Sequence, residues 1–457
     1  MREAHAEDGS VISEVCSYIS RTHALALPPE VVQKAKHQIL DTLAAVVSGS
    51  LLKPGEVARR FVKNQAGKRE AQVIGSTVVT SAINAALVNG MMAHADETDD
   101  SHAKSRIHPG CAIVPAALAM SERVGADGWG FLRGVVAGYD IGCRITQALG
   151  VKDLIKASRS THSIGGNFGA AAAAASVARL KDRDVRFVMS YGAQQAAGIA
   201  TLFRDEEHIE KAFVFAGMPA RNGVTAAVFV EHGFTGVWDS FSGEHNFFQV
   251  FSPDAKPELL SEGLGSRYEI LSTNIKKFAV GSPIQAALDA LLLLLEKHGF
   301  RADDVDSVTA RLPDYGAVVV DDRDMPNINL QHILAVALLD RNLTFETAHS
   351  HERMKDPDVL KVKARIRLVK DAELSAAKVQ RQAIVEVSTR DGAKFREHVV
   401  SVRGTPENPM TTQEVEKKCR ELFTPILGER RSLDLIDRIW NLERVGNVRE
   451  LRPLLSA

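Results

Sequence analysis

Apolar residues recur at helical spacing over most of the first 265 positions of the chain. The segment 27–49 begins with two prolines, carries apolar residues three and four positions apart and closes on a glycine, which predicts a helix. The same pattern predicts helices at 81–95, 111–125, 129–149, 165–180 and 222–233. Small residues are frequent on these segments and allow helix backbones to approach closely, so we expect a compact bundle.

The pattern changes after residue 266. Segment 305–314 predicts a strand, and segment 382–404 alternates apolar and polar residues around Asp391-Gly392, which predicts a hairpin. Helical spacing returns at 283–299, at 328–341 and from 411 to the end. We therefore predict a mostly α protein, with a large all-helical domain over 1–266 that is completed by 406–457. An inserted, smaller α+β lid domain is expected at 267–405.

Composition limits the classes of function. The 457 residues include 56 basic and 57 acidic side chains, so nothing favours nucleic acid or a membrane surface as a partner. The four cysteines are scattered without a CxxC pair, as expected in a reducing compartment. The N-terminus is polar, and the apolar run at 286–295 is too short to span a membrane. These observations predict a cytoplasmic protein.

The stretch HADETDDSHAKSRIHP, residues 94–109, gathers three histidines and four acids between two predicted helices. A solvated loop is the ordinary interpretation of such a segment. Adjacent acids that repel one another, together with the histidines, favour a site instead. A metal site would use Asp99, His102 and His108, with Cys111 nearby. HxxxH, HExxH and calcium-loop spacings are missing, so we favour acid–base chemistry without a metal.

Two further polar turns precede predicted helices. One carries Arg159 and His162, and the other carries Lys211 and Arg221. His108 has the corresponding place before a helix in the first polar stretch. Helix N-termini attract carboxylates and phosphates, so converging turns would bind a small molecule with several negative charges. Ordinary helix capping is the alternative for each turn.

Two other motifs have both a structural and a functional interpretation. The glycines of GGNFG, residues 165–169, lack dinucleotide spacing and follow no strand, so close helix packing explains them better than phosphate binding. Lys276 and Lys277 lie before a predicted helix near the domain junction. They are either solvated or bind an anionic substrate held between the domains.

Three blocks in this order resemble the MmgE/PrpD family over nearly the whole chain. They are NGMMAHADETDDSH with IHPGCAIVPAALA, then THSIGGNFGAAAAAASVARL, then KAFVFAGMPARNGV. Members of that family dehydrate 2-methylcitrate, decarboxylate cis-aconitate or epimerise iminodisuccinate. The resemblance implies a helical domain with an α+β lid, a homodimer, and chemistry on small di- or tricarboxylates without a cofactor. The family's polar positions correspond here to Glu97, Asp99, Asp100, Ser101, His108, His162, Lys211 and Lys276.

The chain departs from the family pattern in three places. Between Ser101 and His108, the loop is slightly longer than in the decarboxylase-like members. Glu97 and Ser101 stand where the family has a different acid and a threonine. Around Lys276, the chain has Gly281, Ser282 and Gln285 where cysteine, arginine and histidine are common. The substrate end of the site is therefore altered, which favours an epimerase of a dicarboxylate such as iminodisuccinate. A dehydratase or decarboxylase of a related polycarboxylate is the alternative.

All of these reactions need an acid or base beside a carbon that carries a carboxylate, and cations for the carboxylates. We predict His108, His162, Lys211 and Lys276 as catalytic residues. The predicted substrate-binding residues are Glu97, Asp99, Asp100, Ser101, His102, Arg221, Lys277 and Tyr139. Two other classes stay open: a binding protein without activity, and a metal-dependent hydrolase. The expected partners are a small anionic substrate and a second copy of the chain.

Overall fold

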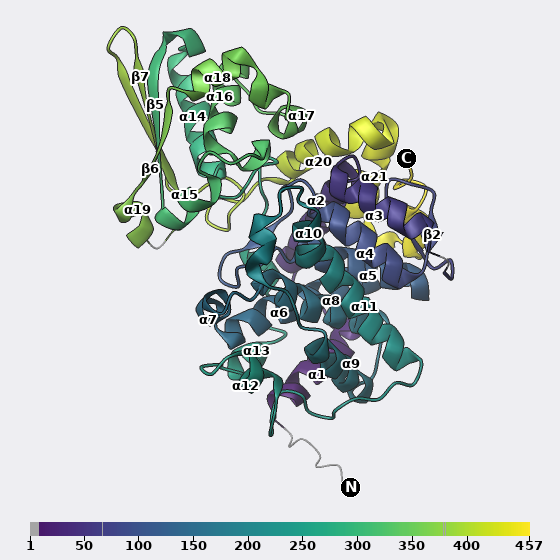
Figure 1. Cartoon of the computed structure of the whole chain (residues 1–457). Coiled ribbons are helices and arrows are strands. Elements are labelled where there is room, and N and C mark those ends of the chain that lie inside the picture. Colours follow the sequence, from purple (N-terminus) through teal and green to yellow (C-terminus); the bar gives the residue numbers. More distant parts are fainter. Residues whose placement is uncertain (1–8, 66, 378, 380) are drawn as a thin grey trace. The chain divides into compact units, whose positions relative to one another are not determined.

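The computed structural model describes residues 9–65, 67–377, 379 and 381–457, and it divides into two compact units (Figure 1). Unit 1 comprises Met1–Ala95, Asp99–Asn274 and Thr412–Ala457. Unit 2 comprises Asp96–Thr98 and Ile275–Thr411. The chain therefore leaves unit 1 twice and returns to it twice.

Unit 1 is built from helices, and the prediction of a mostly α protein is confirmed. Its strands are two short antiparallel pairs, β1 (Ala71–Gln72) with β2 (Val79–Thr80) and β3 (Ser101–His102) with β4 (Thr273–Asn274). The α-helices of this unit are α1 (Val11–Arg21), α2 (Pro29–Gly49), α3 (Lys53–Lys63), α4 (Ala82–Ala93), α5 (Gly110–Val124), α6 (Gly128–Leu149), α7 (Val151–Lys156), α8 (Thr161–Val177), α9 (Asp182–Gln194), α10 (Ile209–Ala212), α11 (Met218–Glu231), α12 (Phe247–Phe251), α13 (Glu258–Ser261), α20 (Thr412–Leu427) and α21 (Glu429–Trp440).

Glycines bring α6 and α8 into close contact at the centre of this unit (Figure 1). A Cβ atom at Gly138 would lie 2.8 Å from the Gly169 carbonyl oxygen, and one at Gly142 would lie 2.7 Å from that of Gly165. Side chains at these positions would force the helices apart. The prediction that the GGNFG glycines serve helix packing is confirmed. Because α8 begins at Thr161, this packing also fixes the helix turn that carries His162.

The segment that contains Lys211 and Arg221 is helical throughout, so the prediction that these residues precede a helix is wrong. Helix α10 continues through the π-helical turn η3 (Phe213–Gly217) into α11. Pro219 lies inside this continuous run, directly after the π-helical turn. The run Ile209–Glu231 is the one described helix with the length and composition of a membrane span, but 72% of its apolar window is buried inside the protein.

The C-terminal helices complete unit 1 by packing on α2. Lys418 of α20 donates to the fully buried Asp41 carboxylate over 2.6 Å. Lys36 donates to the Trp440 carbonyl oxygen over 2.6 Å. Arg452 forms an ion pair of 2.7 Å with the buried Glu122 of α5. The last segment belongs to unit 1 from Thr412 onward, whereas residues 406–411, which we placed in the helical domain, belong to unit 2.

Unit 2 is an α+β structure around a four-stranded sheet of order β6-β5-β7-β8. Strand β5 (Val305–Leu312) is parallel to β6 (Ile366–Lys370) and antiparallel to β7 (Ala383–Thr389), and β7 pairs with β8 (Lys394–Val399). The predicted strand and hairpin are confirmed, and Gly392 has the positive φ of 90° that the tight turn requires. The helices are α14 (Gln285–His298), α15 (Asp314–Val320), α16 (Leu330–Asp340), α17 (Phe345–His349), α18 (Pro357–Lys363) and α19 (Ala372–Ala376).

Helices α14 and α16 pack on the sheet and close the core of unit 2 (Figure 1). Helix α16 also buries a polar side chain: His332 is 1% exposed, and neither ring nitrogen has a hydrogen-bond partner among the residues that the structure describes. Residues 267–274, which we placed in the lid domain, belong to unit 1, because β4 pairs there with β3.

Candidate active site

The polar stretch after α4 is buried, which excludes the solvated-loop interpretation. His94, Asp99 and Asp100 have no exposed surface, and His102 is 1% exposed. Buried acids and histidines are costly unless they are paired, so the pairing of each group indicates its role.

Asp99 lies between two histidines of unit 1. Its Oδ2 atom accepts a hydrogen bond from His94 Nδ1 over 2.8 Å and lies 3.2 Å from His108 Nδ1. His94 is fully buried, whereas the His108 side chain keeps 12% of its surface exposed. A carboxylate in this position orients an imidazole and stabilises its protonated form. His108 is therefore the member of this triad that can meet a ligand.

His162 lies beside His108, as the hypothesis of converging turns predicts. Their ring centroids are 5.1 Å apart with an angle of 29° between the planes. The backbone N–H of His108 donates to His162 Nδ1 over 3.2 Å, which leaves the proton of a neutral His162 ring on Nε2. Dense surrounding protein lowers the pKa of His162 well below its ordinary value, and positive charge on His108, His94 and Lys211 lowers it further, although the ring is only half-buried. His162 is thus neutral near pH 7.

Phe215, in the π-helical turn η3, forms the floor of this cluster. Its ring stacks on His162 at 3.7 Å with an angle of 10°, and on His94 at 4.7 Å. The half-buried Lys211 places its Nζ atom 5.5 Å from the Phe215 ring centroid. The structure thus brings His108, His162 and Lys211 to one place in unit 1. We name this set, with His94, Asp99 and Phe215, the histidine cluster.

Asp100 and Tyr139 lie in the interior beside the cluster and bind each other. The Tyr139 hydroxyl donates to Asp100 Oδ2 over 2.8 Å, and the Gly110 N–H donates to Asp100 Oδ1 over 2.9 Å. Burial raises the pKa of Asp100 to about 7, against the opposing effect of these hydrogen bonds. Burial and the Asp100 carboxylate raise the pKa of Tyr139 well above its ordinary value. The Gly110 contact holds the start of α5, two residues after His108.

Ser101 and His102 anchor the same loop through the β3–β4 pair. The Ser101 hydroxyl accepts from Asn274 over 3.2 Å, and His102 lies 3.3 Å from the Glu269 carboxylate and 2.6 Å from the Ser105 hydroxyl. Burial raises the pKa of Glu269, but hydrogen bonds and charge from His102 and other partners outweigh it and lower the pKa to about 2. Both ring nitrogens of His102 thus face Glu269 and Ser105 and not the histidine cluster.

The remaining predicted residues have contacts elsewhere. Arg221 donates to the Asn222 side chain of α11 over 3.0 Å. In unit 2, the buried Lys276 donates to the Glu97 carbonyl oxygen over 2.6 Å and lies 3.4 Å from its carboxylate. Lys277 forms an ion pair of 2.7 Å with Asp289 of α14. The substrate-contacting roles of these residues stay predictions.

Within the described residues, one set in unit 1 could hold a metal ion: His94, Asp99 and Cys111, whose donor atoms lie within 4.8 Å of one another. This differs from the set considered from the sequence, because His102 pairs with Glu269 and Ser105. The Cys111 thiol donates a hydrogen bond to the His108 carbonyl oxygen over 3.1 Å.

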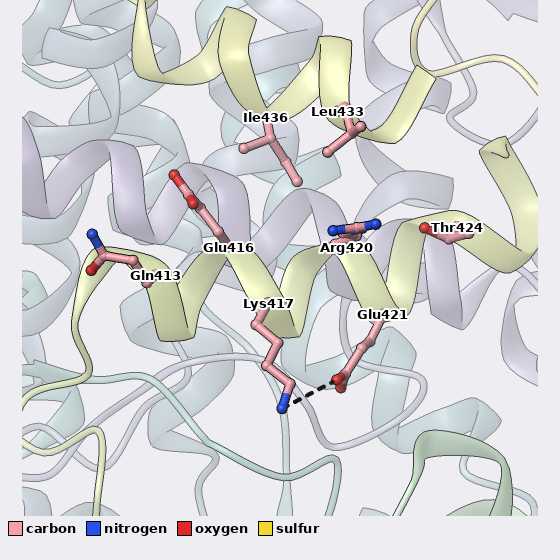
Figure 2. A pocket seen from close by; sticks show the side chains of 8 residues that line it. All are labelled: Gln413, Glu416, Lys417, Arg420, Glu421, Thr424, Leu433 and Ile436. Atoms are coloured by element: carbon pink, nitrogen blue, oxygen red, sulfur yellow. Dashed lines mark ion pairs between the residues drawn. The ribbon is translucent and has the colours of Figure 1, made fainter. Parts of the chain in front are cut away.

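A surface groove of about 550 Å³ lies elsewhere in unit 1, between α20 and α21. Figure 2 shows charged side chains along α20 and the apolar Leu433 and Ile436 on α21. The paired Lys417 and Glu421 point away from these two apolar side chains. No member of the histidine cluster lines the groove. The groove carries both acidic and basic side chains, so it has no preference for an anionic ligand. We therefore place the chemistry at the histidine cluster.

Sequence reasoning did not single out three residues around the cluster. His94 opens the polar stretch, and its spacing of five residues from Asp99 is the only signal that it pairs with that acid. His208 donates through Nε2 to the His94 carbonyl oxygen over 2.9 Å, and Phe215 stacks on two histidines. Neither has a sequence signal, because their proximity depends on how α10 and η3 pack on α4.

Comparisons with known proteins identify the family of the chain. Residues 13–260 match the MmgE/PrpD N-terminal domain, and residues 278–442 match the MmgE/PrpD C-terminal domain. The chain is 24% identical to the cis-aconitate decarboxylase-like protein oryM of Aspergillus oryzae, over 98% of both chains. It is 23% identical to the cis-aconitate decarboxylase of Aspergillus terreus, over 99% of this chain and 97% of that one. It is also 23% identical to the human cis-aconitate decarboxylase, over 96% and 94%. Together, the two matched domains show that the chain belongs to the MmgE/PrpD family.

Proposed function

We propose that this chain is a lyase that works without a cofactor and removes CO₂ from a small polycarboxylate, with cis-aconitate as the first candidate. Two of the named relatives are cis-aconitate decarboxylases and the third is described as decarboxylase-like, and all three match nearly the full length of the chain. They favour this reading over the epimerase that the altered block around Lys276 suggested. One of the altered residues also has a structural role, because Gln285 donates to the Phe278 and Val280 carbonyl oxygens.

The observation that carries the proposal is the stacking of His108 on His162. An epimerase with two bases needs them on opposite faces of one carbon. The lone pairs of imidazole nitrogens lie in the ring planes, and these planes are only 29° from parallel at a centroid distance of 5.1 Å. With ring centroids only 5.1 Å apart, no substrate carbon fits between the two rings. This geometry supports proton delivery from one side, as a decarboxylase requires.

His108 is the proposed proton donor. Asp99 stabilises its imidazolium form from the Nδ1 side at 3.2 Å, so Nε2 is the nitrogen left to exchange a proton with substrate. His94 Nδ1 donates a hydrogen bond of 2.8 Å to the same Asp99 Oδ2 atom. This pairing keeps the carboxylate pointed at His108.

His162 and Lys211 are the proposed binders of the substrate carboxylates. A neutral His162 with its proton on Nε2 donates a hydrogen bond without adding a second positive charge beside His108. Lys211 supplies a cation from the helical segment on the other side of Phe215. A donor and a cation fixed in advance stabilise negative charge as it develops on the substrate.

The reaction balances with these groups alone. The bond between carbon and the departing carboxylate breaks, and CO₂ leaves. The electron pair is delocalised over the neighbouring double bond and carboxylate. The proton of His108 then forms a new C–H bond, which gives an unsaturated dicarboxylate, and solvent reprotonates His108.

Proton NMR in D₂O tests the proposal with cis-aconitate, 2-methylcitrate and the stereoisomers of iminodisuccinate as separate substrates. We expect the vinylic signals of a decarboxylated dicarboxylate from cis-aconitate, with one deuterium incorporated. Interconversion of iminodisuccinate stereoisomers without loss of CO₂ would overturn the proposal in favour of the epimerase. Loss of water from 2-methylcitrate alone would assign a hydro-lyase instead.

A matched pair of variants assigns the activity to the cluster. His108→Asn should reduce turnover by on the order of 10²–10⁴-fold, the usual effect of losing a general acid. His232→Gln changes an exposed histidine of the same unit, at the end of α11, and should leave turnover unchanged. Equal turnover in both variants would remove His108 from the mechanism.

A further inference from the structure

The donor atoms of His94, Asp99 and Cys111 form a compact set inside unit 1. Each comes from a firmly held place: His94 caps the C-terminus of α4, Asp99 is paired with two histidines, and Cys111 is the second residue of α5. All three are fully buried. The mechanism proposed above uses Asp99 and His94 but gives Cys111 no role.

We propose that these three residues bind Zn²⁺, and that the bound ion inhibits the enzyme. The chemistry of the set selects the metal, because one thiolate, one imidazole and one carboxylate are ligands that zinc prefers. Bond lengths of 2.0–2.3 Å place the ligand atoms of a tetrahedral zinc site roughly 3.5 Å apart. The donor atoms, which lie within 4.8 Å of one another, need to move by about an ångström at most to reach that spacing.

His108 lies beside two of the three proposed ligands. Its ring lies 3.2 Å from Asp99 Oδ2, and its backbone carbonyl already accepts the Cys111 thiol. His108 or a water molecule therefore completes the coordination. On binding, the thiol proton of Cys111 leaves to solvent as the Zn–S bond forms, so the site loses one proton and gains a divalent ion.

The expected inhibition rests on the proposed function. A zinc ion bound to Asp99 occupies the carboxylate that contacts His108 Nδ1 from 3.2 Å. Zinc therefore removes the contact that orients the proposed acid. Binding of zinc itself does not depend on which substrate the enzyme uses.

The test measures zinc binding and activity separately on the full chain. Competition with a chromophoric chelator should show one tightly held Zn²⁺ per chain. Cys111→Ser should weaken zinc binding at least tenfold, since even the loss of a group behind a ligand costs 10–100-fold. The serine hydroxyl keeps the hydrogen bond to His108, so fold and basal turnover should stay unchanged. Cys143→Ser, at another buried cysteine on α6, is the matched control and should bind zinc like the unmodified chain.

In the activity assay, micromolar zinc should inhibit the unmodified chain and the Cys143→Ser variant, and EDTA should reverse the inhibition. Cys111→Ser should need at least tenfold more zinc for the same inhibition. No zinc uptake by the unmodified chain, or equal loss of binding in both cysteine variants, would overturn the site. Zinc binding that leaves turnover unchanged or raises it would overturn the inhibitory role while the site itself stands. A chain that binds zinc but turns over none of the substrates would contradict the proposed function instead.

Discussion

His332 offers a measurable link between pH and the stability of unit 2. The side chain is 1% exposed in α16 and has no hydrogen-bond partner among the described residues. Burial lowers its pKa from 6.5 to about 4, helped by the positive charges of Lys363, Arg353 and His351. The folded state therefore binds a proton at His332 less readily than the unfolded state does. The contribution of this group to the free energy of unfolding is present above pH 6.5 and is lost as the pH falls toward 4.

The magnitude follows from the two pKa values. Between 6.5 and about 4, the full effect is about 3 kcal/mol at 1.36 kcal/mol per pH unit. Most of it appears between pH 7 and pH 5, where linkage predicts a loss of about 2 kcal/mol from this group. His332→Leu removes the titrating ring and fills a similar volume with apolar atoms. As the pH falls from 7 to 5, we expect the free energy of unfolding of this variant to rise by about 2 kcal/mol relative to that of the unmodified chain.

Hydrogen exchange of peptides from α16, followed across urea concentrations at pH 5, 6, 7 and 8, measures this difference. It is preferable to tryptophan fluorescence, because Trp129, Trp238 and Trp440 all lie in unit 1. His298→Gln, at an exposed histidine on α14 in the same unit, serves as the control. A difference between His332→Leu and the unmodified chain that changes by less than about 0.5 kcal/mol from pH 7 to pH 5 would refute the reasoning.

Three further outcomes are expected. His162→Ala should lower kcat on the order of 10²–10³-fold, the usual effect of losing one hydrogen-bond donor to developing negative charge, with an unchanged circular dichroism spectrum. An unfolded variant would instead indicate a packing role for this histidine. Exhaustive EDTA treatment and dialysis should leave full activity, and recovery that requires an added divalent metal would contradict chemistry without a cofactor. Asp41→Asn should destabilise the chain by about 3–5 kcal/mol, because it leaves the buried Lys418 ammonium without its charge partner. The double variant Asp41→Leu with Lys418→Met should unfold at nearly the same urea concentration as the unmodified chain; a double variant as unstable as the single one would show that the ion pair itself stabilises.

The helices of unit 1 were predictable because apolar spacing and terminal residues both mark them. Segment 129–149 begins after an aspartate cap, and the observed α6 covers Gly128–Leu149. Segment 209–231 was not predictable in the same way. Gly217, Pro219 and Gly223 suggest a turn, yet they lie in a continuous helical run. Gly217 and Gly223 are needed there because Cβ atoms would come within 2.4 Å of Met91 and Ala171.

The candidate site was predictable in its residue types but not in its pairings. The many histidines and acids in residues 94–109 indicated a site in that stretch. The order of this stretch and the two later sequence blocks indicated His162 and Lys211 as further members. Nothing in sequence distinguishes Asp99, which contacts two histidines, from Asp100, which contacts Tyr139 and Gly110. That distinction depends on which side of the loop each carboxylate faces. The position of Phe215 depends on a π-helical turn that has no sequence signature.

The division of unit 1 into separate stretches of chain has a consequence for synthesis on the ribosome. Helix α2 is synthesised early, but its Asp41 cannot form its ion pair until Lys418 is synthesised about 380 residues later. Unit 2 lies between them and is finished first. The nascent N-terminal helices therefore keep an uncovered face, including a carboxylate without its ammonium, until the final helices are released. A ribosome stalled just before α20 would hold a chain with a folded middle and an incomplete beginning, which makes this last stretch the step at which chaperone dependence should be greatest.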